Sequence, residues 1–196
     1  MKMRNITLPS IALCLLAGST VGGAASLHGP GTTLDVDATQ TKVEFTLGDV
    51  LHTVHGSFKL KSGRIHFDPA TGQASGELVV DAASGATGSG ARDSRMRTKI
   101  LESDQFPDIT FKPDHFDGHL TPEGESAIDL HGMFAIHGGE HEMTLQTMVH
   151  LSGSQLSATT HFAVPYVKWG MKNPSTLFLR VNDKVMIDLQ VVGKIN

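Results

Sequence analysis

The chain has 196 residues, of which 39% are hydrophobic, and its formal net charge is −4. This length is sufficient for one domain with a buried core. The acidic balance disfavours nucleic acid and anionic membrane surfaces as partners, because both repel negative charge.

The first residues have the pattern of a secretory signal peptide. Lys2 and Arg4 are positively charged, residues 11–18 (IALCLLAG) are apolar, and small residues follow as far as Ala25. The apolar run is too short to span a bilayer. We therefore predict cleavage after Ala25, with cleavage after Ala24 as the nearest competitor.

Removal of residues 1–25 sets the properties of the mature chain. It leaves 171 residues and no cysteine, because Cys14 is the only one. It also lowers the net charge to −6, since two basic residues and no acidic residues are lost. We expect the mature protein in the periplasm or outside the cell, without a transmembrane segment. Residues 26–33 (SLHGPGTT) indicate a disordered lead-in, so the folded domain should span residues 34–196.

Residues 34–196 consist mainly of short segments in which apolar and polar side chains alternate. Val43, Phe45 and Leu47, for example, alternate with lysine, glutamate and threonine. This period of two is typical of β-strands with one apolar face. Turn sequences rich in glycine, proline and aspartate separate the segments and predict hairpins. Further inward-facing positions are Phe58, Phe111, Ile128, Leu130, Phe134, Met143, Leu145 and Phe162.

The succession of hairpins predicts an all-β domain. Sequential strands with one apolar face form an antiparallel meander, and about eight of them can close into a barrel without exposed edges. We therefore predict an antiparallel β-barrel, with a two-sheet sandwich as the competing architecture.

The segment Ala91–Phe111 gives the one convincing helix signal. It is rich in helix-forming residues, and Met96, Ile100 and Leu101 lie on one side at spacings of four and five. Pro107 forces the preceding residue into an extended conformation, so the helix must end before it. We expect this α-helix to pack at the end of the barrel.

Positive charge is concentrated at the start of this helix. Arg92, Arg95, Arg97 and Lys99 follow a glycine-rich loop at residues 85–90. Most such runs are solvated surfaces, and the loop can simply be flexible. Arginines beside a helix start also suit a phosphate group, which makes Arg92 and Arg95 candidates for binding an anionic head group.

Eleven histidines raise the question of a metal site. His52 and His55 are three residues apart, and His137 and His141 are four apart, but two glycines make the second pair part of a turn. The sequence contains no HExxH motif, and no cysteine remains after cleavage. Surface or structural histidines are therefore favoured, and we predict neither a metal nor a cofactor.

Catalytic motifs are also missing from the sequence. There is no GxSxG elbow, and acidic residues such as Asp81, Asp129 and Asp188 sit singly on polar strand faces. We predict no catalytic residue. The alternative that remains is a small hydrolase or isomerase that uses His52 or His55 with a carboxylate at the barrel rim.

The segment from Tyr166 to Thr176 holds the only tyrosine and, at Trp169, the only tryptophan. Two interpretations are equally favoured. The rings pack the end of the barrel, or they form the rim of a ligand cavity, where amphipathic rings are well suited.

Five motifs together resemble the YceI-like, polyisoprenoid-binding family, and the resemblance extends over about residues 34–195. They are residues 43–58 (VEF to VHGSF), Arg92-Asp93, residues 106–111 (FPDITF), residues 133–145 and residues 182–187 (NDKVMI). The resemblance implies an extended lipocalin-like barrel whose apolar lumen holds a long isoprenoid chain, such as a polyprenyl phosphate or a quinone. It also implies a periplasmic or secreted protein that can form a homodimer.

This resemblance gives the inward-facing side chains a role. They become candidates for the wall of a lipid-binding lumen that serves transport, storage or an envelope stress response. A filled barrel without a ligand remains the alternative, since eight-stranded barrels occur in both forms. The lumen candidates are Phe45, Phe58, Phe111, Ile128, Leu130, Phe134, Met143, Leu145, Phe162 and Trp169.

Overall fold

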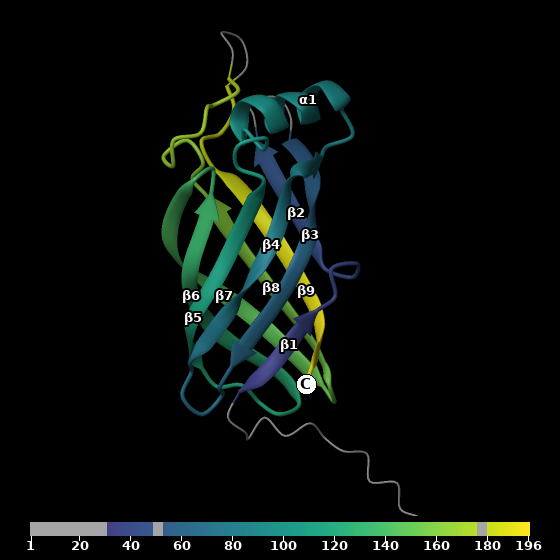
Figure 1. The fold of residues 1–196 in the computed structure, drawn as a ribbon, viewed down its shortest axis with the longest axis vertical. Coiled ribbons are helices and arrows are strands. Elements are labelled where there is room, and N and C mark those ends of the chain that lie inside the picture. The colour runs from purple at the N-terminus through teal and green to yellow at the C-terminus, as the bar shows by residue number, and fades with distance from the viewer. Residues whose placement is uncertain (1–30, 49–52, 176–179) are drawn as a thin grey trace, which may run out of the picture.

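The computed structural model describes residues 31–48, 53–175 and 180–196, which form one long β-barrel with a helix across one end (Figure 1). The helix α1 (Gly90–Arg95) continues as a π-helical turn, η1 (Met96–Ile100). The strands are β1 (Thr32–Val36), β2 (Lys42–Gly48), β3 (Thr53–Phe67), β4 (Ala74–Ala86), β5 (Asp108–Gly118), β6 (Gly124–Ile136), β7 (Gly139–Ser152), β8 (Gln155–Val164) and β9 (Val185–Ile195).

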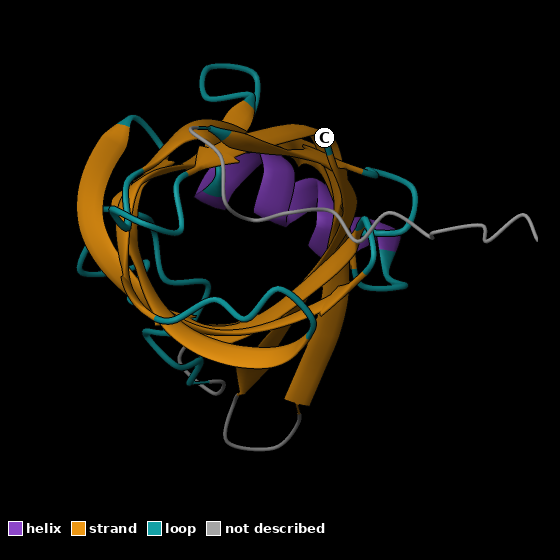
Figure 2. Ribbon diagram, turned by 90° about the horizontal axis from the view of Figure 1, so that it is seen from below, coloured by secondary structure: helices purple, strands orange, loops and turns teal. Residues whose placement is uncertain are grey.

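The nine strands occupy eight positions around a closed antiparallel barrel. From β2 to β9 each strand pairs with the next, and β9 closes the ring by pairing with β2. β1 and β2 share one position, because both lie between β3 and β9. The ring is visible from below in Figure 2. The predicted all-β barrel of about eight strands is confirmed.

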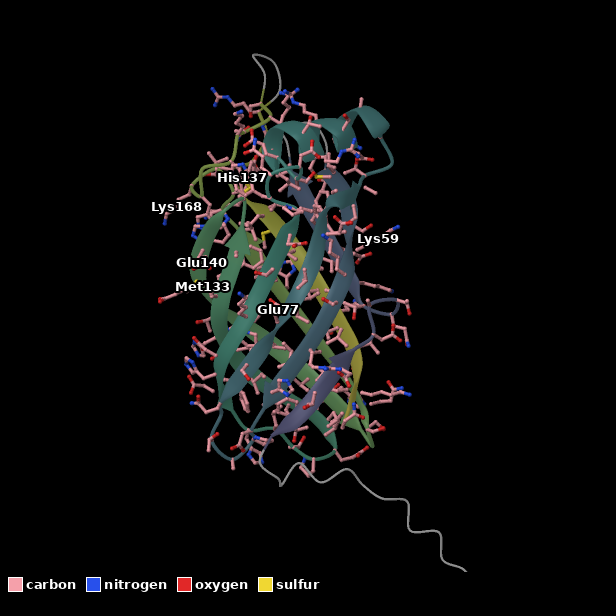
Figure 3. All side chains as sticks on the ribbon, viewed as in Figure 1. Lys59, Glu77, Met133, His137, Glu140 and Lys168 are labelled. Carbon is pink, nitrogen blue, oxygen red and sulfur yellow. The ribbon has the colours of Figure 1, made fainter. Side chains whose placement is uncertain are left out.

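Alternating side chains explain why the sheet closes. In β7, Leu145, Val149 and Leu151 are buried inside the barrel, whereas Thr144 and His150 are exposed. A period of two places every second side chain on the inner face. Labelled charged residues such as Lys59, Glu77 and Glu140 lie on the outer surface (Figure 3).

The two ends of the barrel differ in their connections. At the lower end of Figure 1, where the C-terminus lies, short turns join β3 to β4, β5 to β6 and β7 to β8. At the upper end the helix crosses the barrel, and residues 165–175 fold over the strand ends beside it. Longer connections at one end leave room there for a binding site.

The predicted helix is confirmed, and its second half is wider than an α-helix. The Leu101 N–H donates to the Met96 carbonyl, five residues back, at 2.9 Å. A π-helical turn of this kind brings residues at spacings of four and five onto one side. Met96, Ile100 and Leu101 therefore all face the barrel, which accounts for the irregular apolar spacing in the sequence.

Buried side chains form two clusters along the barrel. The lower cluster, near β1 and the C-terminus, comprises Leu34, Leu60, Phe67, Ala74, Leu78, Phe116, Ile128, Val149, Leu151, Leu156, Val191 and Ile195. The upper cluster, near the helix, comprises Ala82, Leu101, Ile109, Phe111, Phe134, Ile136, Leu145, Val164, Tyr166 and Met171.

The folded domain begins two residues before its predicted start at Leu34. β1 starts at Thr32, and Thr33 exchanges backbone hydrogen bonds with Asn196 at 3.2 and 2.9 Å. The prediction that the disordered lead-in extends to residue 33 is therefore wrong, because Thr32 and Thr33 are ordered in β1 beside the C-terminal residues. The predicted signal peptide lies outside the described residues. Within the described ranges, no helix has the length and hydrophobicity needed to cross a membrane.

Candidate functional site

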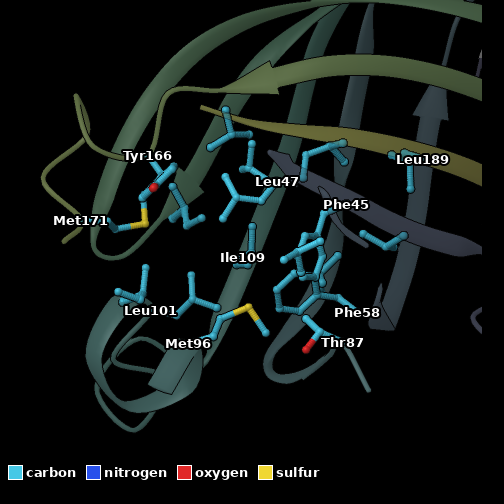
Figure 4. Close-up of a pocket in the computed structure, with 18 of the residues that line it drawn as sticks. Phe45, Leu47, Phe58, Thr87, Met96, Leu101, Ile109, Tyr166, Met171 and Leu189 are labelled. Atoms are coloured by element: carbon cyan, nitrogen blue, oxygen red, sulfur yellow. The ribbon is translucent and has the colours of Figure 1, made fainter. Parts of the chain in front are cut away.

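The upper half of the barrel is hollow. A cavity of about 560 Å³ lies beneath the helix, and its wall is formed by side chains from β2 to β9 and from the helix (Figure 4). Six predicted lumen candidates line it: Phe45, Phe58, Phe111, Phe134, Leu145 and Phe162. The rings of Phe45 and Phe58 lie 5.3 Å apart. The cavity is therefore an apolar space with aromatic walls.

Four predicted lumen candidates do not line the cavity. Ile128 belongs to the packed lower cluster, and Leu130 is partly buried between the two clusters. Met143 packs on the upper cluster outside the cavity wall. The Trp169 ring stacks on His141 at 3.8 Å and so covers the end of the strand rather than the lumen. Alternation gave the correct face for the strand residues but not their height in the barrel.

The helix forms the roof of the cavity. Met96, Ile100 and Leu101 line it from the helix side, and Figure 4 shows Met96 and Leu101 beside the cavity. Met96 packs against Gly85 in β4, where a Cβ atom would collide with its terminal methyl group and with the ring of Phe58. The absence of a side chain at Gly85 therefore allows the roof to lie close to the barrel.

Tyr166 and Met171 form a part of the rim beside the helix. Both are buried and line the cavity, and the Tyr166 hydroxyl donates a hydrogen bond to the Asn182 carbonyl at 2.7 Å. Burial, followed by the nearby Asp183 carboxylate, raises the pKa of Tyr166 to about 12, so its hydroxyl remains a neutral donor. Of the two aromatic residues of this segment, Tyr166 forms the rim and Trp169 packs the barrel end.

Arg92 lines the cavity but is engaged by the loop that precedes the helix. Its Nε donates to the Thr87 hydroxyl at 2.8 Å, and its Nη2 donates to the Thr87 carbonyl at 3.2 Å. The Thr87 hydroxyl in turn donates to the Asp93 carboxylate at 2.5 Å. This network fixes the position of the helix relative to β4.

Arg95 lies between the lumen and an outer groove. It lines the cavity, and it also lines a second hollow on the outer side of the helix, together with Lys99 and Lys172. Among the described residues, no carboxylate forms an ion pair with Arg95. Lys172 was missed by the sequence analysis, because only the folding of residues 165–175 over the rim brings it to the helix.

A second arrangement that the sequence did not reveal fastens the end of the helix to the rim. His137 Nε2 lies 3.0 Å from Glu102 Oε2, and Lys172 Nζ lies 3.5 Å from Glu102 Oε1. The hydrogen bond to His137, followed by the charge of Lys172, lowers the pKa of Glu102. Glu102 and His137 have φ angles of 46° and 51°, a conformation that costs energy for residues other than glycine. We name this group the rim latch.

The histidines proposed for catalysis are not supported as a site. His55 lies on the outer face, with Nδ1 3.1 Å from the Thr46 hydroxyl, and His52 lies outside the described residues. The rim latch has a histidine and a carboxylate, but neither Glu102 nor His137 lines the cavity. Among the residues that the structure describes, the polar ones that line it are Thr87, Ser89, Arg92, Arg95, Thr110 and Tyr166.

One group of potential metal ligands lies on the outer surface. Ligand atoms of His115, Asp117 and His131 are within 4.8 Å of one another. Both ring nitrogens of His131 are engaged, Nε2 with Asp117 at 3.2 Å and Nδ1 with the Thr144 hydroxyl at 2.9 Å. The two imidazole rings are also stacked at 4.2 Å. These contacts are compatible with a bound metal ion, because the second ring nitrogen of a metal-bound histidine usually has such a partner, but an exposed carboxylate beside two histidines is also common without one.

A closed antiparallel barrel with an apolar hollow under a helical roof defines the molecule as a lipocalin-like barrel. The chain belongs to the YceI-like family, since the family model described as a YceI-like domain matches residues 34–193. The resemblance indicated by the sequence motifs is therefore confirmed.

Solved structures with the same fold include three bacterial proteins. BcnA of Burkholderia cenocepacia has a TM-score of 0.68 and 20% identity, over 81% of this chain and 99% of BcnA. A polyisoprenoid-binding domain of Saccharophagus degradans, implicated in plant cell wall breakdown, has a TM-score of 0.65 and 16% identity, over 83% of this chain and 98% of that domain. A YceI protein of Campylobacter jejuni has a TM-score of 0.58 and 19% identity, over 74% of this chain and 86% of that protein. Among curated proteins, none matches this chain.

Proposed function

We propose that this protein binds an isoprenoid lipid inside the upper half of its barrel. The observation that carries the proposal is the apolar cavity of about 560 Å³ beneath the helix. This volume lies in the range of about 300–1,000 Å³ typical of small-molecule sites. Burial of an apolar chain is favourable by about 25 cal/mol per Å². The family, and a structural neighbour described as polyisoprenoid-binding, support an isoprenoid as that chain.

The lipid enters with its tail first. Thr87, Ser89, Arg92 and Arg95 all belong to the helix and the loop before it, whereas the lower wall of the cavity is apolar. A polar head therefore fits at the roof and an apolar tail fits below it. Arg95 is the residue placed to contact an anionic head, because Arg92 is held by the loop.

The cellular role follows from the N-terminal pattern. We propose that the protein is exported and holds the lipid in the envelope or outside the cell, for transport, storage or a stress response. N-terminal sequencing of the envelope fraction should give Ser26 as the first residue. An intact Met1 in the cytoplasmic fraction would contradict this proposal.

Lipid binding can be tested directly on gently purified protein. Mass spectrometry of an organic extract should detect an isoprenoid in stoichiometric amount. The variant Ile187→Trp fills the cavity and should lose the lipid. Gln190→Trp is the matched control, because residue 190 lies on the same strand and is exposed. Equal lipid content in the two variants would show that the lipid is bound elsewhere.

A further inference from the structure

The lower half of the barrel is filled with side chains. All twelve residues of the lower cluster are at most 9% exposed, and two of them, Phe67 and Phe116, are aromatic. Ten of the twelve do not line the cavity. Tightly packed interiors leave almost no voids larger than a water molecule. A ligand tail therefore cannot pass down the whole barrel without displacing this cluster.

The boundary between the packed and hollow halves lies at two leucines. Leu60 and Leu78 belong to the lower cluster and also line the cavity, so each has one side in the packed core and one side facing the hollow. Leu78 is held from behind, because its side chain occupies the space that a Cβ atom on Gly63 would need. Val80, two residues further along β4 on the same face, also lines the cavity and packs against both clusters. We name Leu60 and Leu78 the floor of the cavity.

The volume above this floor sets a length for the tail. A cavity of about 150 Å³ holds a benzene molecule, which corresponds to roughly 25 Å³ for each carbon atom. At that rate the 560 Å³ of this cavity accommodate about 20 carbon atoms, which is about four isoprene units. Any further units would have to remain outside, in contact with water.

We infer that the floor makes this protein a binder of short isoprenoid chains, with about four isoprene units as the longest tail that is fully enclosed. The inference rests on the proposed function and specifies its ligand class. Longer polyprenyl chains bind no more tightly than a four-unit chain, because their extra units bury no additional apolar surface.

The dependence of affinity on chain length tests this inference. Prenyl monophosphates with two, three, four, six and eight isoprene units are measured by competition against a fluorescent prenyl analogue at constant detergent. Each added unit up to four should tighten binding at least about tenfold, because each unit buries several further carbon atoms in the cavity. Beyond four units the affinity should change less than about threefold. Continued tightening to six or eight units would overturn the inference.

Variants of the floor should change the chain length at which the affinity stops rising, which we call the break. Leu78→Ala opens space toward the lower cluster, so the break should shift to five or more units. Val80→Phe narrows the cavity above the floor and should shift it to three or fewer; it also serves if Leu78→Ala does not fold. Leu156→Ala is the matched control, since it removes the same atoms from the lower cluster without touching the cavity.

The outcomes separate the two proposals. A break that stays at four units in Leu78→Ala and Val80→Phe, or one that moves equally in Leu156→Ala, would reject the floor as the determinant of length. Absence of binding at every length, in the wild type, would instead contradict the proposed function itself, and the inference with it.

Discussion

Phe116 and Phe134 offer a direct comparison of the two halves of the barrel. They face the interior from the neighbouring strands β5 and β6, and their exposed fractions are similar, 5% and 8%. Phe116 lies in the packed lower cluster, whereas Phe134 borders the cavity. Replacing each by alanine removes the same atoms from two different surroundings.

The expected losses of stability differ because of the space that each ring leaves. Phe116→Ala creates an isolated void in a packed core, and such changes cost about 3–5 kcal/mol. In Phe134→Ala the vacated space joins a hollow that already exists, so mainly the transfer free energy of the ring is lost, about 1.5–3 kcal/mol. The contacts of Phe134 with Phe162 and Trp169, at centroid distances of 6.1 and 5.8 Å, favour the upper part of that range.

Urea denaturation of lipid-free protein measures the difference. Both variants should keep the wild-type m-value, and Phe116→Ala should be less stable than Phe134→Ala by about 1 kcal/mol or more. With lipid bound, the gap should narrow, because Phe134→Ala then also loses ligand contacts. Equal losses in the lipid-free proteins, or a larger loss for Phe134→Ala, would refute the hollow upper half.

Three further predictions concern the roof and the rim. Arg95→Ala should weaken a prenyl phosphate about ten- to a hundredfold in calorimetry and leave the corresponding prenol unchanged, whereas Arg92→Ala should weaken both, because it loosens the loop before the helix. The folded state lowers the pKa of Glu102, so its contribution to stability is complete above its ordinary value of 4.5 and is lost as the pH falls through the lowered pKa. Urea midpoints of the wild type and of Glu102→Gln should therefore differ at neutral pH and converge in acid; a constant gap would exclude this linkage. Gly85→Ala should displace the Met96 side chain, lower the melting temperature and speed lipid exchange. An unchanged exchange rate would show that the helix does not control access of the lipid to the cavity.

The sequence was sufficient to predict the barrel and its roof, because both depend on local patterns. Alternation identified the inner face of each strand, and Pro107 marked the end of the helical region before β5. Ile128 and Phe134 show where local patterns stop being informative. Both face inward from β6, but one is packed and the other borders the cavity. Their heights depend on the pairing of all the strands, which no local pattern encodes.

The candidate head-group site was predicted only in part for a similar reason. The basic run lies at the end of the barrel that holds the cavity, but the sequence did not distinguish Arg92, which is bound to Thr87, from Arg95. The rim latch joins Glu102 to His137, 35 residues later, through two left-handed backbone positions. Glutamate does not favour that conformation and histidine adopts it only occasionally, so no local sequence pattern predicts the latch.

The sharing of one barrel position by β1 and β2 has a consequence for the order of folding. Both strands are completed by β9, and the Thr41 hydroxyl accepts a hydrogen bond from the Val192 N–H, 151 residues away in the chain. Contacts at such separation carry a large loop-closure entropy and form slowly. The earlier hairpins can form between neighbouring segments of the chain. The barrel closes only when β9 pairs with β1 and β2. Until then there is no enclosed lumen, so a lipid can be taken up only after β9 has paired with β1 and β2.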